Sequence, residues 1–145
     1  MANKIKILFL CTGNSCRSQM AEGWAKYLHP ASLEPFSAGI ETHGLNPLAI
    51  KVMAEVGIDI SSQKSKLTTE LTGINFDYIV AVCDQAAKSC PLFPGPGKIV
   101  RKIFPDPPKM AAAETTEKEK LECYRKVRDE IKDFVKGFPD NLLTP

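Results

Sequence analysis

The sequence predicts an α/β protein, with a four-stranded parallel sheet and helices on both faces of that sheet. Two observations lead to this prediction. Short apolar segments alternate with amphipathic ones, as strands do with crossover helices. The 145 residues suffice for one hydrophobic core and contain no internal repeat. Residues 1–145 are therefore expected to form a single domain.

Four apolar segments are expected to form the strands. The first and third are almost entirely apolar, as parallel strands covered on both faces require. The expected strands span residues 4–10, 33–39, 76–83 and 97–104.

Three segments are expected to form helices, at residues 15–28, 46–58 and 115–136. Asn46 is suited to cap the second helix, Pro47 to occupy its first position and Gly57 to end it. The buried face of the last helix is expected to carry Leu121, Tyr124, Val127, Ile131 and Phe134.

Charge and cysteine content exclude several classes of protein. The net charge of +2 is too small to indicate a nucleic-acid or membrane partner. No segment resembles a signal peptide or a membrane span, so a cytoplasmic protein is expected. An odd number of cysteines in a reducing compartment favours catalytic, redox-active or merely buried thiols over structural disulfides. They are Cys11, Cys16, Cys83, Cys90 and Cys123.

Three reactive side chains stand where predicted strands end. Cys11 follows the first strand, Cys83 ends the third, and Asp106 follows the fourth. Because open parallel sheets bind ligands beyond the carboxyl ends of their strands, we expect these three side chains to share one site.

The stretch CTGNSCRS, which begins at Cys11, has the features of an oxyanion-binding loop. It links a strand to a helix, so backbone N–H groups and the helix N-terminus can bind an anion. Gly13 and Asn14 tolerate the positive φ angles that such a loop needs. Arg17 can bind two oxygens of a tetrahedral dianion, and Ser18 can donate its hydroxyl to the cysteine thiolate. The candidate oxyanion-binding residues are Thr12, Gly13, Asn14, Ser15, Cys16, Arg17 and Ser18.

The same loop predicts an activated nucleophile. Lowering the pKa of the Cys11 thiol from about 8.5 to roughly 6 needs about 3.4 kcal/mol of preferential thiolate stabilisation. The helix N-terminus, several N–H donors and Arg17 are expected to supply it. The alternative is a buried cysteine at a strand end with Arg17 on an exposed helix, but the glycine, asparagine and serine favour the functional interpretation.

The longer stretch CTGNSCRSQMAEGWA resembles the active-site loop of the low-molecular-weight protein tyrosine phosphatase superfamily. More closely, it resembles the thioredoxin-coupled arsenate reductases built on that scaffold. The similarity continues through FSAGIETHGLNPLAIKVMAEVGIDIS, the segment with Cys83 and Cys90, the Asp106-Pro107 step and YRKVRDEI. The resemblance implies reduction of arsenate, with phosphate or sulfate as competing anions. It implies no bound cofactor and thioredoxin as the external reductant.

The resemblance also implies a relay of three cysteines. Cys11 attacks arsenate, and Asp106 protonates the departing oxygen. Cys83 then attacks Cys11 and arsenite leaves. Cys90 next attacks Cys83, and thioredoxin reduces the Cys83–Cys90 disulfide.

The spacing of Cys83 and Cys90 bears on this relay. In an intact helix they would lie about 10.5 Å apart, beyond the roughly 7 Å that a disulfide allows. The segment would therefore have to unwind. The alternative is two small buried apolar residues, which suits Cys83 better than Cys90.

Asp106 is a candidate general acid because the following proline restrains its backbone. The alternative is a turn-forming aspartate. Relatives that hydrolyse phosphotyrosine place tyrosines just after this step, where this chain has Pro108 and Lys109. The resemblance therefore implies a small inorganic oxyanion.

Three residues match a potassium site that some members of the resembled family carry, and a fourth departs from it. Asn14, Glu22 and Ser37 match positions of that site, whereas Lys66 stands where those members have an aspartate. The hypothesis is that the Lys66 ammonium replaces the cation, so no metal is expected. The alternative is an exposed lysine.

Two other functions stay open. A phosphatase would use Cys11, Arg17 and Asp106 to hydrolyse a phosphomonoester, with the later cysteines passive. A noncatalytic oxyanion-binding protein or thiol redox sensor is the other, although passive binding needs no activated thiolate. No role in the chemistry is expected for Cys123, His29 and His43.

Overall fold

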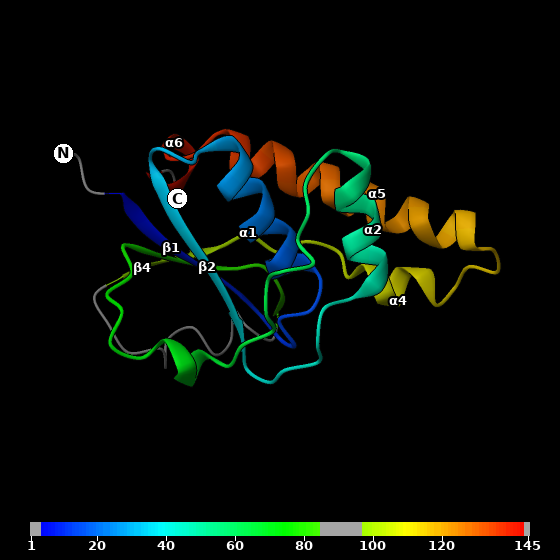
Figure 1. Ribbon diagram of the computed structural model, residues 1–145, viewed down its shortest axis with the longest axis horizontal. Helices are drawn as coiled ribbons and strands as arrows, with labels where there is room; N and C mark the ends of the chain where they lie inside the picture. Colours follow the sequence, from blue (N-terminus) through cyan, green and yellow to red (C-terminus); the bar gives the residue numbers. More distant parts are fainter. Residues whose placement is uncertain (1–3, 85–96, 144–145) are drawn as a thin grey trace.

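Residues 4–84 and 97–143 are described in a computed structural model of the protein. They form a four-stranded sheet in the order β2-β1-β3-β4, in which neighbouring strands are parallel (Figure 1). This sheet confirms the predicted fold class. The strands are β1 Ile5–Cys11, β2 Leu33–Gly39, β3 Tyr78–Ala81 and β4 Lys98–Arg101.

The end of β1 lies between the ends of two neighbouring strands. Cys11 pairs with Gly39 at the end of β2. On the other side, Val82 N donates to Leu10 O at 3.0 Å just after β3, and Cys83 follows. The third and fourth strands are shorter than expected, because the residues at their ends lie outside the regular ladder. Neighbouring strands lie about 4.8 Å apart, so both cysteines reach the same edge of the sheet.

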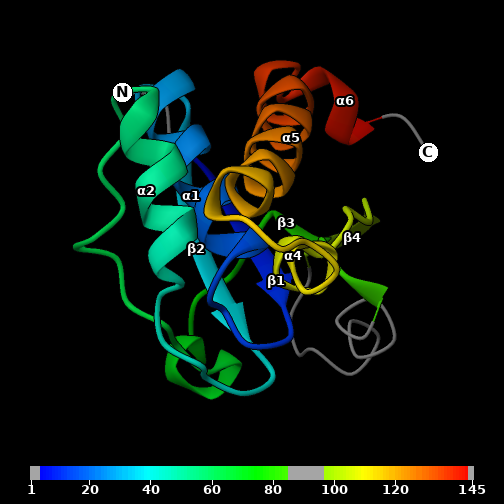
Figure 2. The same ribbon diagram turned by 90° about the vertical axis from the view of Figure 1, so that its right-hand side faces the viewer.

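The three long helices, which were expected to cover both faces of the sheet, gather on one side of it (Figures 1 and 2). The first packs on β1 and β2 and against the last, which also packs on the second. Within residues 4–84 and 97–143, none of the helices combines the length and apolar character that crossing a membrane would require. The long helices are α1 Arg17–Leu28, α2 Pro47–Glu55 and α5 Glu117–Lys136.

Three short helices were not expected from the sequence. Each has only four or five residues, which is too few for a helical period to show. They are η1 Thr68–Leu71, α4 Pro107–Ala111 and α6 Asp140–Leu143.

The predicted ends of α2 are confirmed. Asn46 Oδ1 accepts from the N–H groups of Leu48 (2.9 Å) and Ala49 (3.2 Å), and Pro47 occupies the first helical position. Gly57 follows the helix with a φ of +82°, a left-handed conformation that favours glycine.

The core-facing side of α5 differs from the prediction at one position. Leu121, Tyr124, Val127 and Ile131 are buried as expected. Val135 is fully buried, whereas Phe134 is only partly buried. Positions three and four after Ile131 lie on the same face. The smaller side chain enters the core, and the Phe134 ring packs at its edge against Phe104 and Phe138.

Candidate active site

The oxyanion loop, residues 11–18, connects the end of β1 to α1. Its carbonyl groups accept hydrogen bonds from the segment that follows β2. Because the N–H and C=O of a trans peptide group point in opposite directions, these bonds turn N–H groups of the loop towards its inside. Inward N–H groups are an anion-binding arrangement. The bonds run from Ile40 N to Cys11 O (3.3 Å), Glu41 N to Thr12 O (3.0 Å), His43 N to Gly13 O (3.0 Å) and Asn46 N to Ser15 O (2.9 Å).

Asn14 holds the turn of the loop from within. It adopts the expected positive φ, +48°, and is fully buried. Its Nδ2 donates to Ser18 Oγ at 2.9 Å. Its Oδ1 accepts from Gln19 Nε2 (3.0 Å) and from Lys66 N (2.7 Å). The side chain therefore ties the loop to α1 and to the segment before η1.

Gly13 leaves space for the His43 ring and does not use a conformation that favours glycine. The expected positive φ is absent at this residue. A Cβ added there would lie 2.3 Å from Nδ1 of His43, whose ring covers the loop. The His43 Nε2 in turn lies 3.3 Å from Glu41 Oε2.

Arg17 lies at the start of α1 with its guanidinium held at two points. Nη1 donates to Phe104 O at 3.0 Å, and Nη2 lies 3.7 Å from Asp106 Oδ1. Its Nε is buried without a hydrogen-bond partner among the described residues. A buried guanidinium N–H without a partner is costly unless an anion or another acceptor satisfies it. The residues present therefore fit an oxyanion beside the loop.

The structure brings the two cysteines at the sheet edge into contact. Cys11 and Cys83 are free cysteines with 4% and 3% of their surfaces exposed, and Cys83 is close enough to be the largest cause of the raised pKa of Cys11. Thr12 Oγ1 lies 3.2 Å from Cys83 Sγ. Cys90 lies outside the described residues.

The pKa of Cys11 differs from the prediction. The hydrogen bond with Cys83 and burial of the thiol raise the pKa well above the ordinary value. The charge of Arg17 and the N–H of Thr12 act in the opposite direction but do not outweigh these two causes. The predicted lowering to about 6 is therefore wrong for this arrangement, because it considered the loop without its neighbour.

Cys16 belongs to the wall of the loop. It is buried, and burial raises the pKa of its thiol far above the ordinary range, with Arg17 opposing and Asp106 reinforcing the shift. Cys16 therefore remains a neutral thiol.

Asp106 occupies the N-cap position of α4 without a side-chain capping bond. Its side chain is 40% exposed and faces Arg17. The carboxyl therefore lies at the open side of the site, next to the guanidinium.

A second polar cluster lies behind the loop. Ser37 Oγ donates to Glu22 Oε1 at 2.5 Å, and Lys26 Nζ lies 2.6 Å from Glu22 Oε2. Lys66 Nζ lies 4.0 Å from Glu22 Oε1 and donates to Lys64 O at 3.0 Å. The described residues contain no group of three or more His, Cys, Asp or Glu side chains that could hold a metal ion.

Two contacts of the site were not expected from the sequence. The carbonyl of Phe104 orients Arg17, and the hydroxyl of Thr12 contacts Cys83. Thr12 follows β1 next to the end of β3, so the strand order would have indicated its contact with Cys83, whereas Phe104 lies beyond the end of β4, two strands away from β1.

Residues 6–143 match the family described as low molecular weight phosphotyrosine protein phosphatase. The chain is 30% identical to a solved arsenate reductase in the oxidized state, with a TM-score of 0.76, covering 94% of this chain and 98% of that one. It is 26% identical to a low molecular weight protein tyrosine phosphatase from T. tengcongensis, with a TM-score of 0.74, covering 95% and 99% of the two chains.

The chain thus belongs to the low molecular weight phosphotyrosine protein phosphatase family. Within it, the chain is 51% identical over 140 residues to the arsenate reductase of Bacillus subtilis (strain 168), covering 97% of this chain and 98% of that relative.

Proposed function

We propose that this protein reduces arsenate to arsenite and that Cys11 and Cys83 carry out the reduction. The proximity of these two buried, free thiols, one at the end of β1 and one just after the neighbouring β3, carries the proposal. Hydrolysis of a phosphomonoester needs only the first thiol, whereas reduction needs a second one within reach of it. The high identity to an arsenate reductase over nearly the whole chain supports the same assignment.

The first step forms a covalent bond between the Cys11 sulfur and arsenic. The inward N–H groups of the oxyanion loop and the Arg17 guanidinium bind the tetrahedral dianion. Cys11 sulfur attacks arsenic, and one As–O bond breaks. Asp106 protonates the departing oxygen, which leaves as water, and the Cys11 proton balances the one that Asp106 gives up. Arsenic stays pentavalent in this step.

The second step transfers the electrons. Cys83 sulfur attacks Cys11 sulfur, and an S–S bond forms as the S–As bond breaks. The electron pair of the broken bond goes to arsenic, which leaves as trivalent arsenite together with the Cys83 proton. The two thiols are oxidised to a disulfide, so electrons and atoms balance.

Turnover requires that this disulfide be reduced again. Cys90 attacks Cys83, and the resulting Cys83–Cys90 disulfide is reduced by thioredoxin, so no bound cofactor is needed. This part rests on the sequence resemblance, because Cys90 lies outside the described residues. Thiol chemistry of this kind persists in a reducing compartment, which supports a cytoplasmic location.

The Lys66 ammonium takes the place of a potassium ion beside Glu22 and Ser37. Its position within 4.0 Å of Glu22 Oε1 supports this assignment. Phosphate and sulfate, which share the tetrahedral oxyanion shape, compete with arsenate at the loop.

A phosphatase is the second candidate function. The arrangement of Cys11, Arg17 and Asp106 supports it, because these groups suffice for phosphomonoester hydrolysis without Cys83. In that case the Cys11–Cys83 contact would have no catalytic use.

One experiment separates these candidates. NADPH consumption is followed with thioredoxin, thioredoxin reductase and arsenate for the wild type and for Cys83→Ser and Cys90→Ser. The matched control is Cys123→Ser, which removes a half-buried α5 thiol outside the proposed relay. Multiple turnovers in the wild type and the control alone support the relay.

Two other outcomes would contradict it. Aryl-phosphate hydrolysis that is undiminished in both relay variants, without arsenate turnover in the wild type, would identify a phosphatase. Absence of both activities would leave an oxyanion-binding protein or a thiol redox sensor.

A further inference from the structure

Asn46 connects the oxyanion loop to two helices. Its backbone N–H donates to Ser15 O at 2.9 Å. Its Oδ1 caps α2 by accepting from the N–H groups of Leu48 and Ala49. Its Nδ2 donates to the Tyr124 hydroxyl on α5 at 3.0 Å. One partly buried residue therefore joins the loop, α2 and α5.

The bond to Ser15 orients one peptide group of the loop. The Ser15 carbonyl and the Cys16 N–H belong to the same planar group and point in opposite directions. Since Asn46 holds the carbonyl from outside, the Cys16 N–H is turned towards the inside of the loop. The position of Asn46 thereby sets the direction of one anion donor.

Tyr124 provides a fixed anchor for Asn46. Only 3% of its surface is exposed, on a helix that packs against α1, α2 and α4. Burial raises the pKa of Tyr124, with Asn46 opposing the shift. The hydroxyl therefore stays neutral at ordinary pH and retains its bond to the amide of Asn46.

We propose that Tyr124 is a positioning residue that acts through Asn46. It holds the Ser15–Cys16 peptide group in the orientation that binds a tetrahedral oxyanion. This inference rests on the proposed oxyanion binding by the loop and deepens it. Tyr124 itself does not touch the anion. Its bond fixes a donor before binding, so less of the binding free energy is lost in ordering the loop.

The test is a double-mutant cycle read by the affinity for inorganic phosphate, measured by isothermal titration calorimetry. Tyr124→Phe removes only the hydroxyl. Asn46→Ser keeps a side-chain oxygen that can cap α2 but lacks the amide donor. We expect each variant to bind phosphate about three- to tenfold more weakly, as the loss of one neutral hydrogen bond predicts. The double variant should bind phosphate no more weakly than the single variant with the lower phosphate affinity, because both changes break the same bond.

The matched control is Tyr27→Phe, which removes the hydroxyl of a tyrosine that is 60% exposed on α1. Its phosphate affinity should equal that of the wild type. In Tyr124→Phe, the backbone amide resonance of Cys16 should also shift in a ¹⁵N–¹H NMR spectrum. A tyrosine that only stabilises α5 would lower the melting temperature without moving this resonance or the phosphate affinity.

Two results would overturn the positioning role alone. They are equal phosphate affinity in wild type and Tyr124→Phe, and losses that add in the double variant. A wild type that binds no phosphate would instead overturn the oxyanion site, and the positioning role with it. The wild-type titration therefore distinguishes the failure of the proposed function from the failure of this inference.

Discussion

Gly39 and Gly13 both border the oxyanion loop, but only Gly39 is enclosed by backbone. A Cβ on Gly39 would lie 2.5 Å from the Glu41 carbonyl oxygen and 2.7 Å from that of Thr12. These atoms cannot move unless the loop moves. We expect Gly39→Ala to lower the free energy of unfolding by about 1–3 kcal/mol, the usual cost of overpacking. Phosphate binding should weaken as well. Urea unfolding and phosphate titration measure the two effects.

Gly13→Ala is the matched control. Its Cβ would meet the exposed ring of His43, which can rotate away. Gly13→Ala should lower the free energy of unfolding less than Gly39→Ala does. Adding His43→Ala to Gly13→Ala should restore the lost stability. A Gly39→Ala protein as stable as the wild type would contradict this account of the loop.

The Cys83 thiol is the largest cause of the raised pKa of Cys11, so we expect the Cys11 thiolate of the wild type to form at higher pH than an ordinary thiolate. Cys83→Ala removes the largest raising cause, so the pH profile of Cys11 alkylation should move to lower pH. At pH 7 the rate should rise about tenfold for each unit by which the pKa falls. Iodoacetamide labelling, resolved by peptide mass spectrometry, measures it.

Cys123→Ala serves as the control for this shift and should leave the Cys11 profile unchanged. If Cys83→Ala also left it unchanged, burial alone would account for the raised pKa of Cys11.

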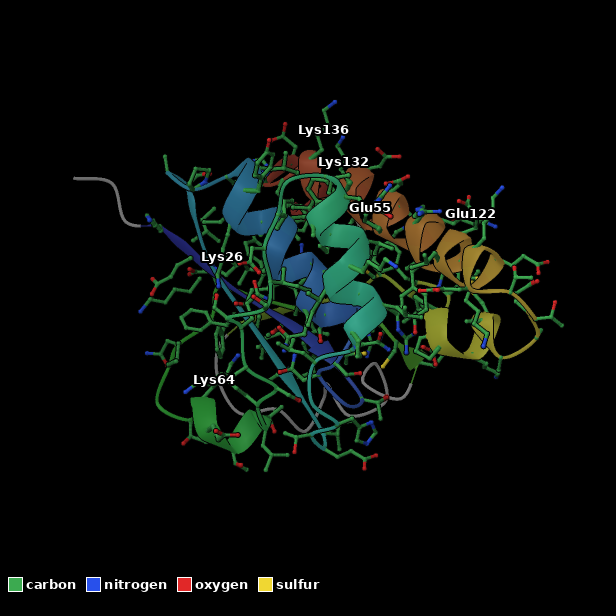
Figure 3. The ribbon with its side chains drawn as sticks, turned by 45° about the vertical axis from the view of Figure 1, so that its right-hand side comes forward. Lys26, Glu55, Lys64, Glu122, Lys132 and Lys136 are labelled. Atoms are coloured by element: carbon green, nitrogen blue, oxygen red, sulfur yellow. The ribbon has the colours of Figure 1, made fainter. Side chains whose placement is uncertain are left out.

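At the scale of elements, two arginines of α5 hold the end of α2 with unequal strength. Both Arg125 and Arg128 contact Glu55, which Figure 3 shows on α2 at the side that meets α5. Arg128 is buried and also donates to Val52 O at 2.9 Å, whereas Arg125 is more exposed. Arg128→Met should therefore cost about 1–3 kcal/mol of unfolding free energy, because it leaves a buried carbonyl without its donor.

Arg125→Met is the comparison and should cost less than about 1 kcal/mol, as exposed ion pairs usually do. Urea unfolding of the two variants measures both losses of unfolding free energy. Equal losses would mean that the bond to Val52 contributes nothing beyond the shared contact with Glu55.

The longer elements could be predicted because their patterns extend over several turns or residues. Residues 33–39 match β2, and the cap at Asn46 and the stop at Gly57 match the ends of α2. The short helices could not be predicted, since four or five residues hold no period. The choice between Phe134 and Val135 could not be predicted either, because both lie on the same face of α5 and packing decides.

At the scale of the whole molecule, Lys66 joins the segment before η1 to Glu22 on α1. Since its ammonium already lies 4.0 Å from Glu22 Oε1, we expect replacement of sodium by potassium to leave the melting temperature and arsenate turnover of the wild type unchanged. In Lys66→Asp, potassium should raise the melting temperature, because a carboxylate now replaces the cation. A clear potassium effect on the wild type would contradict the proposal.

The site could be predicted in part. The oxyanion loop consists of consecutive residues, so its Gly, Asn and Arg are visible in the sequence. The contact of Cys83 with Cys11 depends on β3 lying next to β1, which only the strand order reveals. The raised pKa of Cys11 could not be predicted from the loop, because burial and Cys83 outweigh Arg17. The role of Cys90 stays a prediction.

The central place of β1 has a consequence for the design and divergence of enzymes on this fold. The backbone after β3 leaves the sheet one strand away from Cys11, whatever side chain it carries. In a hydrolase with this topology, one substitution just after β3 would place a thiol beside the cysteine of the oxyanion loop, with no new loop or helix. The first two thiols of a reduction can thus arise along an existing edge, whereas repeated turnover would still need a way to reduce the disulfide.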